Sequence, residues 1–244
     1  MLGLPDSVTA LLFDLDGVLT QTAKVHDRAW KQTFDAYLKR RDGDGFTPFD
    51  AGADYDEYVD GLPRYDGVRN FLKSRGIELP EGDPSDPPSA ETICGIGNRK
   101  NELVLEMIKH DGVQPYEGSV RFVKAAREAG LRRAVVSSSA NCRDVLIAAG
   151  IEDLFEARVD GATAEEQHLK GKPHPDTFLA GARALGVAAE HAAVFEDALA
   201  GVQAGRDGKF GYVVGVDRVG QADALRAHGA SLVVSDLDEL LTGT

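Results

Sequence analysis

The sequence has few cysteines, no long apolar run and no basic stretch anywhere along its 244 residues. Cys94 and Cys142 are its only cysteines, too few for a disulfide framework or a four-cysteine zinc site. No segment approaches the apolar length that crosses a membrane, and the N-terminus lacks a basic segment followed by an apolar one. We therefore expect a cytoplasmic protein that has no membrane partner.

The charge balance is strongly acidic, with a formal net charge of −13. A chain of this charge is a poor partner for nucleic acid, because phosphate backbones are held by clustered lysine and arginine. An acidic protein that binds an anionic substrate needs a local positive site or a metal cation. The length allows one large domain or a core with an inserted second domain.

The segment from Leu11 to Thr20 carries the most informative pattern in the chain. A short apolar run without helical period ends in Asp14 and Asp16, and Gly17 follows at once. Such a run is typical of a buried strand in a parallel sheet, and open sheets of this kind bind ligands at the carboxyl ends of their strands. Side chains two apart in an extended segment point the same way, so both carboxylates can face one reacting group.

The chain after residue 112 alternates predicted strands and helices, which indicates a doubly wound parallel sheet with helices on both faces. Residues 22–112 lack strong strand signals and contain helical patterns at 22–40, 68–74 and 100–110, with an exposed Pro/Asp-rich loop at 79–89. The predicted fold is thus an α/β, Rossmann-like core domain (residues 1–21 and 113–244) with an inserted all-helical cap domain (residues 22–112). In the core we expect strands at 131–136, 155–159, 192–195, 210–216 and 232–234, and helices at 120–129, 141–149, 175–185 and 198–204.

Two polar segments lie just before predicted helices of the core. Ser137, Ser138 and Asn141 lie between a strand and a helix, where hydroxyls and backbone N–H groups suit an anion, although an ordinary serine-rich helix cap has the same composition. Lys172 stands in a proline-rich segment just before a helix, and a surface lysine is the alternative interpretation.

A second acidic pair, Glu196 and Asp197, ends another predicted strand. Carboxylates beside Asp14 would repel one another without a cation, and hard oxygen ligands favour Mg²⁺ over zinc. We expect Asp14, Asp16, Glu196 and Asp197 to hold it. The chemistry that uses all these parts is phosphoryl transfer through an aspartyl phosphate. Asp14 would attack phosphorus, Asp16 would act as general acid and base, and the metal, Lys172 and Ser137 would balance the charge.

These residues resemble a known set of motifs. The segment Asp14–Thr20, Ser137, Lys172 and the pair Glu196-Asp197, in this order, are similar to the four motifs of the haloacid dehalogenase superfamily of phosphotransferases, and the helical insertion resembles its small cap. Within that superfamily the chain resembles the β-phosphoglucomutase-like subfamily. The resemblance implies Mg²⁺ and a small phosphorylated sugar as substrate: β-glucose 1-phosphate converted to glucose 6-phosphate through glucose 1,6-bisphosphate. We expect a monomer.

The resemblance also implies roles for residues of the cap. Thr22 and His26 match positions that follow the first motif, with His26 coupling the cap to the general acid. Arg64, in a glycine-flanked loop, would hold the phosphate that does not react, and Lys100 matches a cap lysine of the subfamily.

Several positions depart from the subfamily pattern: Asp60 replaces a frequent lysine, Gly67 and Ala198 replace serines, and the loop at 79–89 is longer. These departures do not affect the residues expected for phosphoryl transfer, but they leave the identity of the sugar substrate open. A sugar-phosphate phosphatase of the same fold is the alternative function. A non-enzymatic module on this scaffold would be expected to lose Asp14, Asp16 or Asp197, and all three are present.

Overall fold

The computed structural model describes residues 2–242, and the chain forms two compact units. The first, which we call the core unit, comprises Met1–Gln21 and Val113–Thr244. The second, the cap unit, comprises Thr22–Gly112. In the core unit the two segments that join the units pair with each other, through hydrogen bonds from Gln21 N to Gln114 O and from Tyr116 N to Leu19 O, both 2.9 Å.

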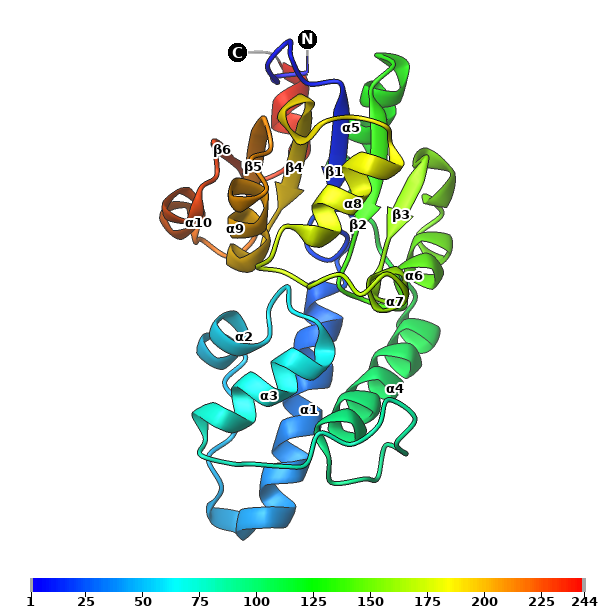
Figure 1. Cartoon of the computed structure of the whole chain (residues 1–244). Coiled ribbons are helices and arrows are strands. Elements are labelled where there is room, and N and C mark those ends of the chain that lie inside the picture. Colours follow the sequence, from blue (N-terminus) through cyan, green and yellow to red (C-terminus); the bar gives the residue numbers. More distant parts are fainter. Residues whose placement is uncertain (1, 243–244) are drawn as a thin grey trace. The chain divides into compact units, whose positions relative to one another are not determined.

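The core unit contains one six-stranded sheet in the order β3-β2-β1-β4-β5-β6, in which every pair of neighbours is parallel (Figure 1). The first strand therefore lies in the middle, and the chain crosses over on both sides of it. The predicted doubly wound sheet is confirmed. The strands are β1 (Ala10–Phe13), β2 (Arg132–Val136), β3 (Ala157–Val159), β4 (Ala192–Glu196), β5 (Tyr212–Val216) and β6 (Leu232–Val234).

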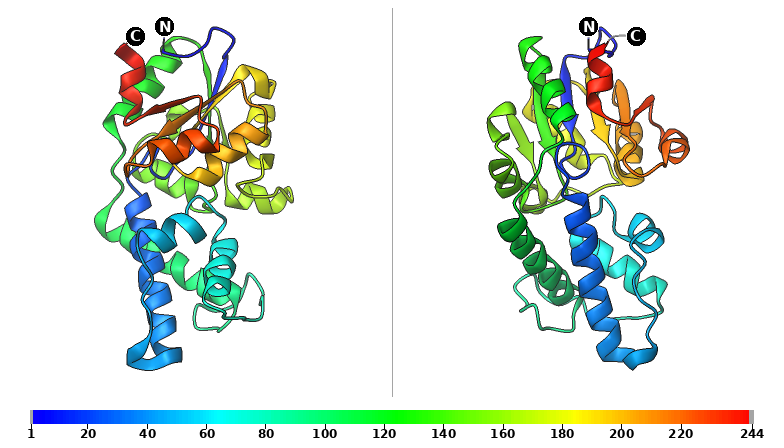
Figure 2. Two further views of the ribbon diagram at one scale, coloured as in Figure 1. Left: turned by 90° about the vertical axis from the view of Figure 1, so that its left-hand side faces the viewer. Right: turned by 180° about the vertical axis from the view of Figure 1, so that it is seen from behind.

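Helices cover both faces of this sheet, because successive side chains of each strand point to opposite faces. Leu12 packs in one hydrophobic cluster with Phe178 and Val202, whereas Phe13 stacks on Phe195 with ring centroids 4.5 Å apart and meets Phe122 edge-on. Helices α8 and α9 lie on the first face and α5 on the second (Figures 1 and 2). The core helices are α5 (Glu117–Glu128), α6 (Cys142–Ala148), α7 (Gly161–Glu166), α8 (Asp176–Ala184), α9 (Leu199–Asp207) and α10 (Ala222–His228).

The cap unit is entirely helical within residues 22–112 and has its own aromatic core. Phe34 lies between Trp30 and Phe71, with ring centroids 5.1 and 4.1 Å away, and Phe49 packs on both phenylalanines. The buried residues of α1, among them Trp30 and Phe34, recur at helical spacing, as expected for the helical pattern predicted at 22–40. The cap helices are α1 (Ala23–Asp42), α2 (Ala53–Tyr58), α3 (Arg64–Ser74) and α4 (Ile93–Asp111).

Some helices differ from the prediction. Helix α4 begins at Ile93, seven residues before the predicted start, because Thr92 caps it through a 2.9 Å hydrogen bond from Gly95 N to Thr92 Oγ1. Its early glycines had hidden the helical pattern. Helices α2, α7 and α10 were not predicted, and they are only six or seven residues long. Within residues 2–242 no helix is long and apolar enough to cross a membrane.

Candidate active site

Sheet register brings the two acidic motifs together. Phe13 of β1 pairs with Phe195 of β4, and the backbone N–H of Asp14 donates to Phe195 O at 2.9 Å. Asp14 therefore lies level with Glu196, at the carboxyl ends of neighbouring central strands. This is the sheet edge where parallel α/β folds place their sites, at the point where the strand order reverses.

Lys172 joins these carboxylates. Its ammonium donates to Asp14 Oδ1 and to Glu196 Oε1, and it lies 3.5 Å from the carbonyl oxygen of Val136 at the end of β2. All three charged side chains are buried. The lysine thus links the ends of β1, β2 and β4. It lies in the proline-rich segment before α8 that was identified from the sequence.

The burial of these charges shifts their proton affinities. Desolvation raises the pKa of Asp14 well above its usual range, and repulsion from Glu196 and Asp16 raises it further, while Lys172 opposes the shift. Desolvation alone would lower the pKa of Lys172, but the attraction of Asp14 and Glu196 outweighs it and raises that pKa. Lys172 therefore stays protonated at neutral pH, and the carboxylate cluster favours an additional cation.

Three carboxylates can meet at one ion. Oxygen atoms of Asp14, Glu196 and Asp197 lie within 4.8 Å of one another. The set consists of hard oxygen donors, which fits Mg²⁺. Asp16 is not a member of this group, and its place as a ligand stays a prediction. Both oxygens of Glu196 also accept hydrogen bonds, from Lys172 and from Ala198 N at 2.8 Å.

The segment after Asp14 is a turn rather than a continuing strand. β1 ends at Phe13, and the carbonyl oxygen of Leu15 accepts hydrogen bonds from Leu19 N and Thr20 N, both at 2.9 Å. Gly17 N donates to Thr20 O at 2.8 Å. Asp16 therefore stands on this turn, close enough to Asp14 for their charges to interact.

The serine-rich segment follows β2, as predicted. Ser137 is buried, its backbone N–H donates to Val159 O at 2.9 Å, and its Oγ accepts from Ser139 N at 3.1 Å. Ser138 and Asn141 belong to the same loop. Helix α6, which starts after Asn141, has only seven residues, so its dipole is weaker than that of the longer helix predicted at 141–149. The loop keeps Ser137 beside the strand end that Lys172 touches.

Two further residues of this site were not predicted from the sequence. Arg218, after β5, donates from Nε to Gly17 O at 2.9 Å and stacks on the ring of Tyr116 at 3.6 Å. Gln221 donates from Nε2 to Asp197 O at 3.0 Å. They hold the backbones of the first and fourth motifs. The sequence signal that could have identified them is their position just after the strand predicted at 210–216.

The predicted cap residues lie on three elements of the cap unit. Lys100 of α4 is buried, with Nζ 2.7 Å from Nδ1 of His26 and 4.7 Å from the centre of the Trp30 ring. Thr22 is buried at the start of α1, and its carbonyl oxygen accepts from His26 N at 2.9 Å.

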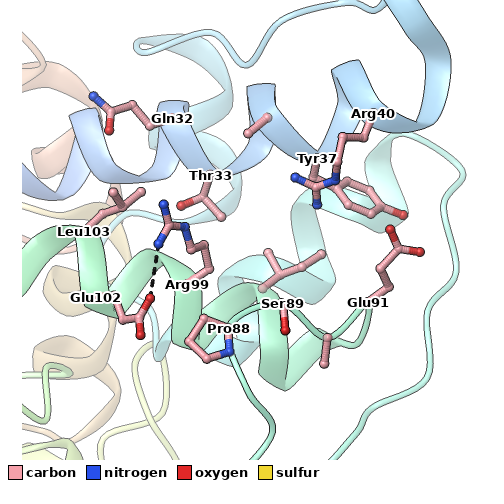
Figure 3. A pocket seen from close by; sticks show the side chains of 13 residues that line it. Gln32, Thr33, Tyr37, Arg40, Pro88, Ser89, Glu91, Arg99, Glu102 and Leu103 are labelled. Carbon is pink, nitrogen blue, oxygen red and sulfur yellow. Dashed lines mark hydrogen bonds and ion pairs between the residues drawn. The ribbon is translucent and has the colours of Figure 1, made fainter.

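Arg64 is the first residue of α3, and its Nη2 donates to the hydroxyl of Tyr65 at 2.9 Å. Elsewhere in the cap unit, a hollow of about 660 Å³ lies between α1, α4 and residues 88–91 (Figure 3). Arg99 in its wall is paired with Glu102 at 3.1 Å. The lining contains none of the predicted site residues.

Comparison with known proteins agrees with the motifs. A model of the haloacid dehalogenase-like hydrolase family matches residues 8–209. The chain is 56% identical over 247 residues to a β-phosphoglucomutase of Mycobacterium tuberculosis, covering 99% of this chain and 94% of that protein. It is 30% identical to the β-phosphoglucomutase of Bacillus subtilis, covering 95% of this chain and 91% of that protein. The crystal structure of β-phosphoglucomutase from Clostridium difficile aligns with a TM-score of 0.75 at 26% identity, covering 96% and 93%.

Proposed function

The chain belongs to the haloacid dehalogenase-like hydrolase family, and from this membership we propose that it is a Mg²⁺-dependent sugar phosphomutase. Its substrate is β-glucose 1-phosphate, its product glucose 6-phosphate, and glucose 1,6-bisphosphate is both intermediate and activator. The 56% identity to a β-phosphoglucomutase over nearly the whole chain supports this substrate.

The observation that carries the proposal is the buried contact of Lys172 with Asp14 and Glu196 at the sheet edge. A transferring phosphoryl group needs a nucleophile on one side and positive charge around its oxygens. Asp14 supplies the carboxylate, and Lys172 is the fixed cation beside it. Ser137, at the end of the adjacent strand β2, supplies a hydroxyl for a phosphate oxygen.

The reaction runs in two balanced steps. A carboxylate oxygen of Asp14 forms a bond to the phosphorus at C1 of glucose 1,6-bisphosphate, the bond from phosphorus to O1 of the sugar breaks, Asp16 gives its proton to O1, and glucose 6-phosphate leaves. In the second step Asp16 takes the proton of a hydroxyl of β-glucose 1-phosphate, whose oxygen attacks phosphorus and releases the Asp14 carboxylate. The bisphosphate is thereby regenerated.

Asp14, Glu196 and Asp197, whose oxygens lie within 4.8 Å of one another, would hold Mg²⁺ together with Asp16 from the turn. When bound, the ion would neutralise phosphate oxygens and reduce the repulsion among the carboxylates. Arg218 and Gln221 keep the backbones of Gly17 and Asp197 in place for this.

Arg64 and Lys100 distinguish a mutase from a hydrolase. A mutase substrate keeps one phosphate while the other reacts, so it needs a second cationic site, and a hydrolase that passes phosphate to water does not. Arg64, at the start of α3, binds the phosphate that does not react. Lys100, buried on α4 with Nζ 2.7 Å from Nδ1 of His26, supplies a further cation of the cap unit for that phosphate.

The test is to incubate the protein with Mg²⁺, β-glucose 1-phosphate and a trace of glucose 1,6-bisphosphate, and to follow products by ³¹P nuclear magnetic resonance. Glucose 6-phosphate is the expected product, and omission of the bisphosphate should slow its appearance. Release of inorganic phosphate and glucose in its place would identify a phosphatase and overturn the mutase. The Asp14→Asn variant and a chelator are the negative controls.

A further inference from the structure

Two side chains of the cap unit connect Arg64 to the Pro/Asp-rich loop. Arg64 Nη2 donates to the hydroxyl of Tyr65 at 2.9 Å, and its guanidinium carbon lies 4.8 Å from the centre of the Tyr65 ring. That hydroxyl donates in turn to Oδ1 of Asn98 at 2.9 Å. Both hydrogens of the Asn98 amide go to the loop, to the carbonyl oxygens of Pro84 and Asp86 at 3.0 and 2.9 Å.

The direction of these bonds is fixed along the whole chain of contacts. The guanidinium can only donate, so the Tyr65 oxygen accepts and its single hydrogen must point to Asn98. The Asn98 oxygen accepts that hydrogen, and its nitrogen meets two carbonyl oxygens, which leaves one possible orientation of the amide. Each member is therefore held in one rotamer by its neighbours.

The loop that ends this chain of contacts is itself ordered by its own side chains. Asp86 Oδ2 accepts from Thr92 Oγ1 at 2.6 Å and from Asp83 N at 3.1 Å, while Asp83 Oδ1 accepts from the hydroxyl of Ser85 at 2.6 Å. Thr92 is also the N-cap of α4. Most of the loop is exposed, as the sequence predicts, but it is tied to the helix that carries Asn98.

Helix α4 is shaped to receive the tyrosine. A Cβ atom on Gly97 would lie 2.7 Å from Cδ1 of Tyr65, closer than side-chain atoms approach one another. Only glycine at position 97 lets the ring lie against the helix beside Asn98. The ring is therefore fixed by packing as well as by its hydroxyl.

We propose that Tyr65 and Asn98, held by the loop at residues 79–89, are positioning residues that preorganise Arg64 for the phosphate that does not react. This inference rests on the proposed function, in which Arg64 binds that phosphate. A free arginine loses rotamer entropy when it binds an anion, and one already held in its binding rotamer loses less. The pair therefore increases the affinity for substrates with a second phosphate over simple phosphate esters.

The experiment measures binding in the Asp14→Asn protein, which cannot be phosphorylated, by titration calorimetry with glucose 1,6-bisphosphate in Mg²⁺. Tyr65→Phe and Asn98→Ala should each weaken bisphosphate binding about tenfold, the range of a lost hydrogen bond that supports a charged group. The affinity for Mg²⁺, measured without a sugar phosphate, should not change, because Arg64 is not among the residues proposed to hold the ion. Tyr58→Phe and Asn70→Ala, which remove the same groups elsewhere in the cap, are the matched controls.

A double-mutant cycle separates positioning from a structural effect. In the Arg64→Ala background Tyr65→Phe should have no further effect on bisphosphate affinity, because the residue it positions is gone. An equal loss with and without Arg64, or unchanged affinity in Tyr65→Phe and Asn98→Ala, would overturn the inference and leave the proposed function standing. Failure of the Asp14→Asn protein with Arg64 intact to bind the bisphosphate at all would overturn the proposed function itself.

Discussion

Gly17 and Asp197 fit against each other at the edge of the sheet, where a Cβ atom on residue 17 would lie 1.7 Å from Oδ2 of Asp197. Gly17 also has φ of +83°, a conformation that other residues rarely adopt. The glycine of the first motif thus serves the fourth motif directly, since its missing side chain leaves the space that the Asp197 carboxylate occupies.

Gly17→Ala should therefore displace Asp197 and weaken Mg²⁺ binding by about tenfold or more, the usual cost of disturbing the support of a metal ligand. Gly220→Ala is the matched control, because Gly220 has φ of +86° with no atom within 4 Å of an added Cβ. Both variants should lose stability of about 1 kcal/mol from backbone strain. Mg²⁺ titrations that give the same affinity for both would contradict the fit between Gly17 and Asp197.

Asp14→Asn should abolish turnover, by about 10⁴-fold or more, because an amide oxygen cannot replace the attacking carboxylate. After incubation with glucose 1,6-bisphosphate and rapid quenching, mass spectrometry should find a phosphoryl group on the unaltered protein and none on the variant. Asp6→Asn, at an exposed site, should behave like the unaltered protein. A phosphorylated Asp14→Asn protein would place the nucleophile elsewhere.

The same substitution should have a pH-dependent effect on stability in the absence of metal. Desolvation raises the pKa of Asp14 in the folded state, so the folded protein holds this proton more tightly than the unfolded chain does. Below the pKa that Asp14 has in the unfolded chain, the group is protonated in both states and its ionisation does not change the free energy of unfolding. It lowers the free energy of unfolding as pH rises from there through the folded pKa. Asparagine, which cannot ionise, avoids this loss.

Urea unfolding in a chelator should thus show Asp14→Asn as more stable than the unaltered protein at pH 7.5, by about 1 kcal/mol or more. The difference should shrink toward pH 4. Saturating Mg²⁺ should reverse the order, since the metal stabilises the protein that binds it better. A less stable Asp14→Asn protein at pH 7.5 in chelator would mean that the attraction of Lys172 outweighs burial.

Arg218→Met should lower kcat by about tenfold and the free energy of unfolding by about 2 kcal/mol, because a half-buried charged donor is lost from Gly17 O and from Asp236, both at 2.9 Å. Steady-state kinetics and urea unfolding measure the two effects. Arg226→Met, which removes an exposed pair with Asp223, should change neither by a comparable amount. Unaltered kcat in Arg218→Met would show that the Gly17 turn does not depend on this arginine.

Local sequence patterns were sufficient for most of the core. Apolar runs such as Leu11–Phe13 ending in charged residues indicated buried parallel strands, and the fold class follows from their alternation with helices. Short helices were missed, α7 and α10 among them, because six or seven residues carry too little periodicity to stand out. The start of α4 was missed because Gly95 and Gly97 resemble a turn.

Local sequence patterns are enough to predict the chemistry of the candidate site, because Asp14, Asp16, Lys172, Glu196 and Asp197 each lie at a recognisable strand end or helix start. The register of the strands places Asp14 and Glu196 side by side, where both contact Lys172. Only the tertiary structure shows that Asp14, Glu196 and Asp197 can reach one ion. The contacts of Arg218 with Gly17, across 201 residues, and of Tyr65 with Asn98 arise only from tertiary packing. No local pattern encodes them, since each depends on loops and helices that are distant in sequence and fixed by the packed core.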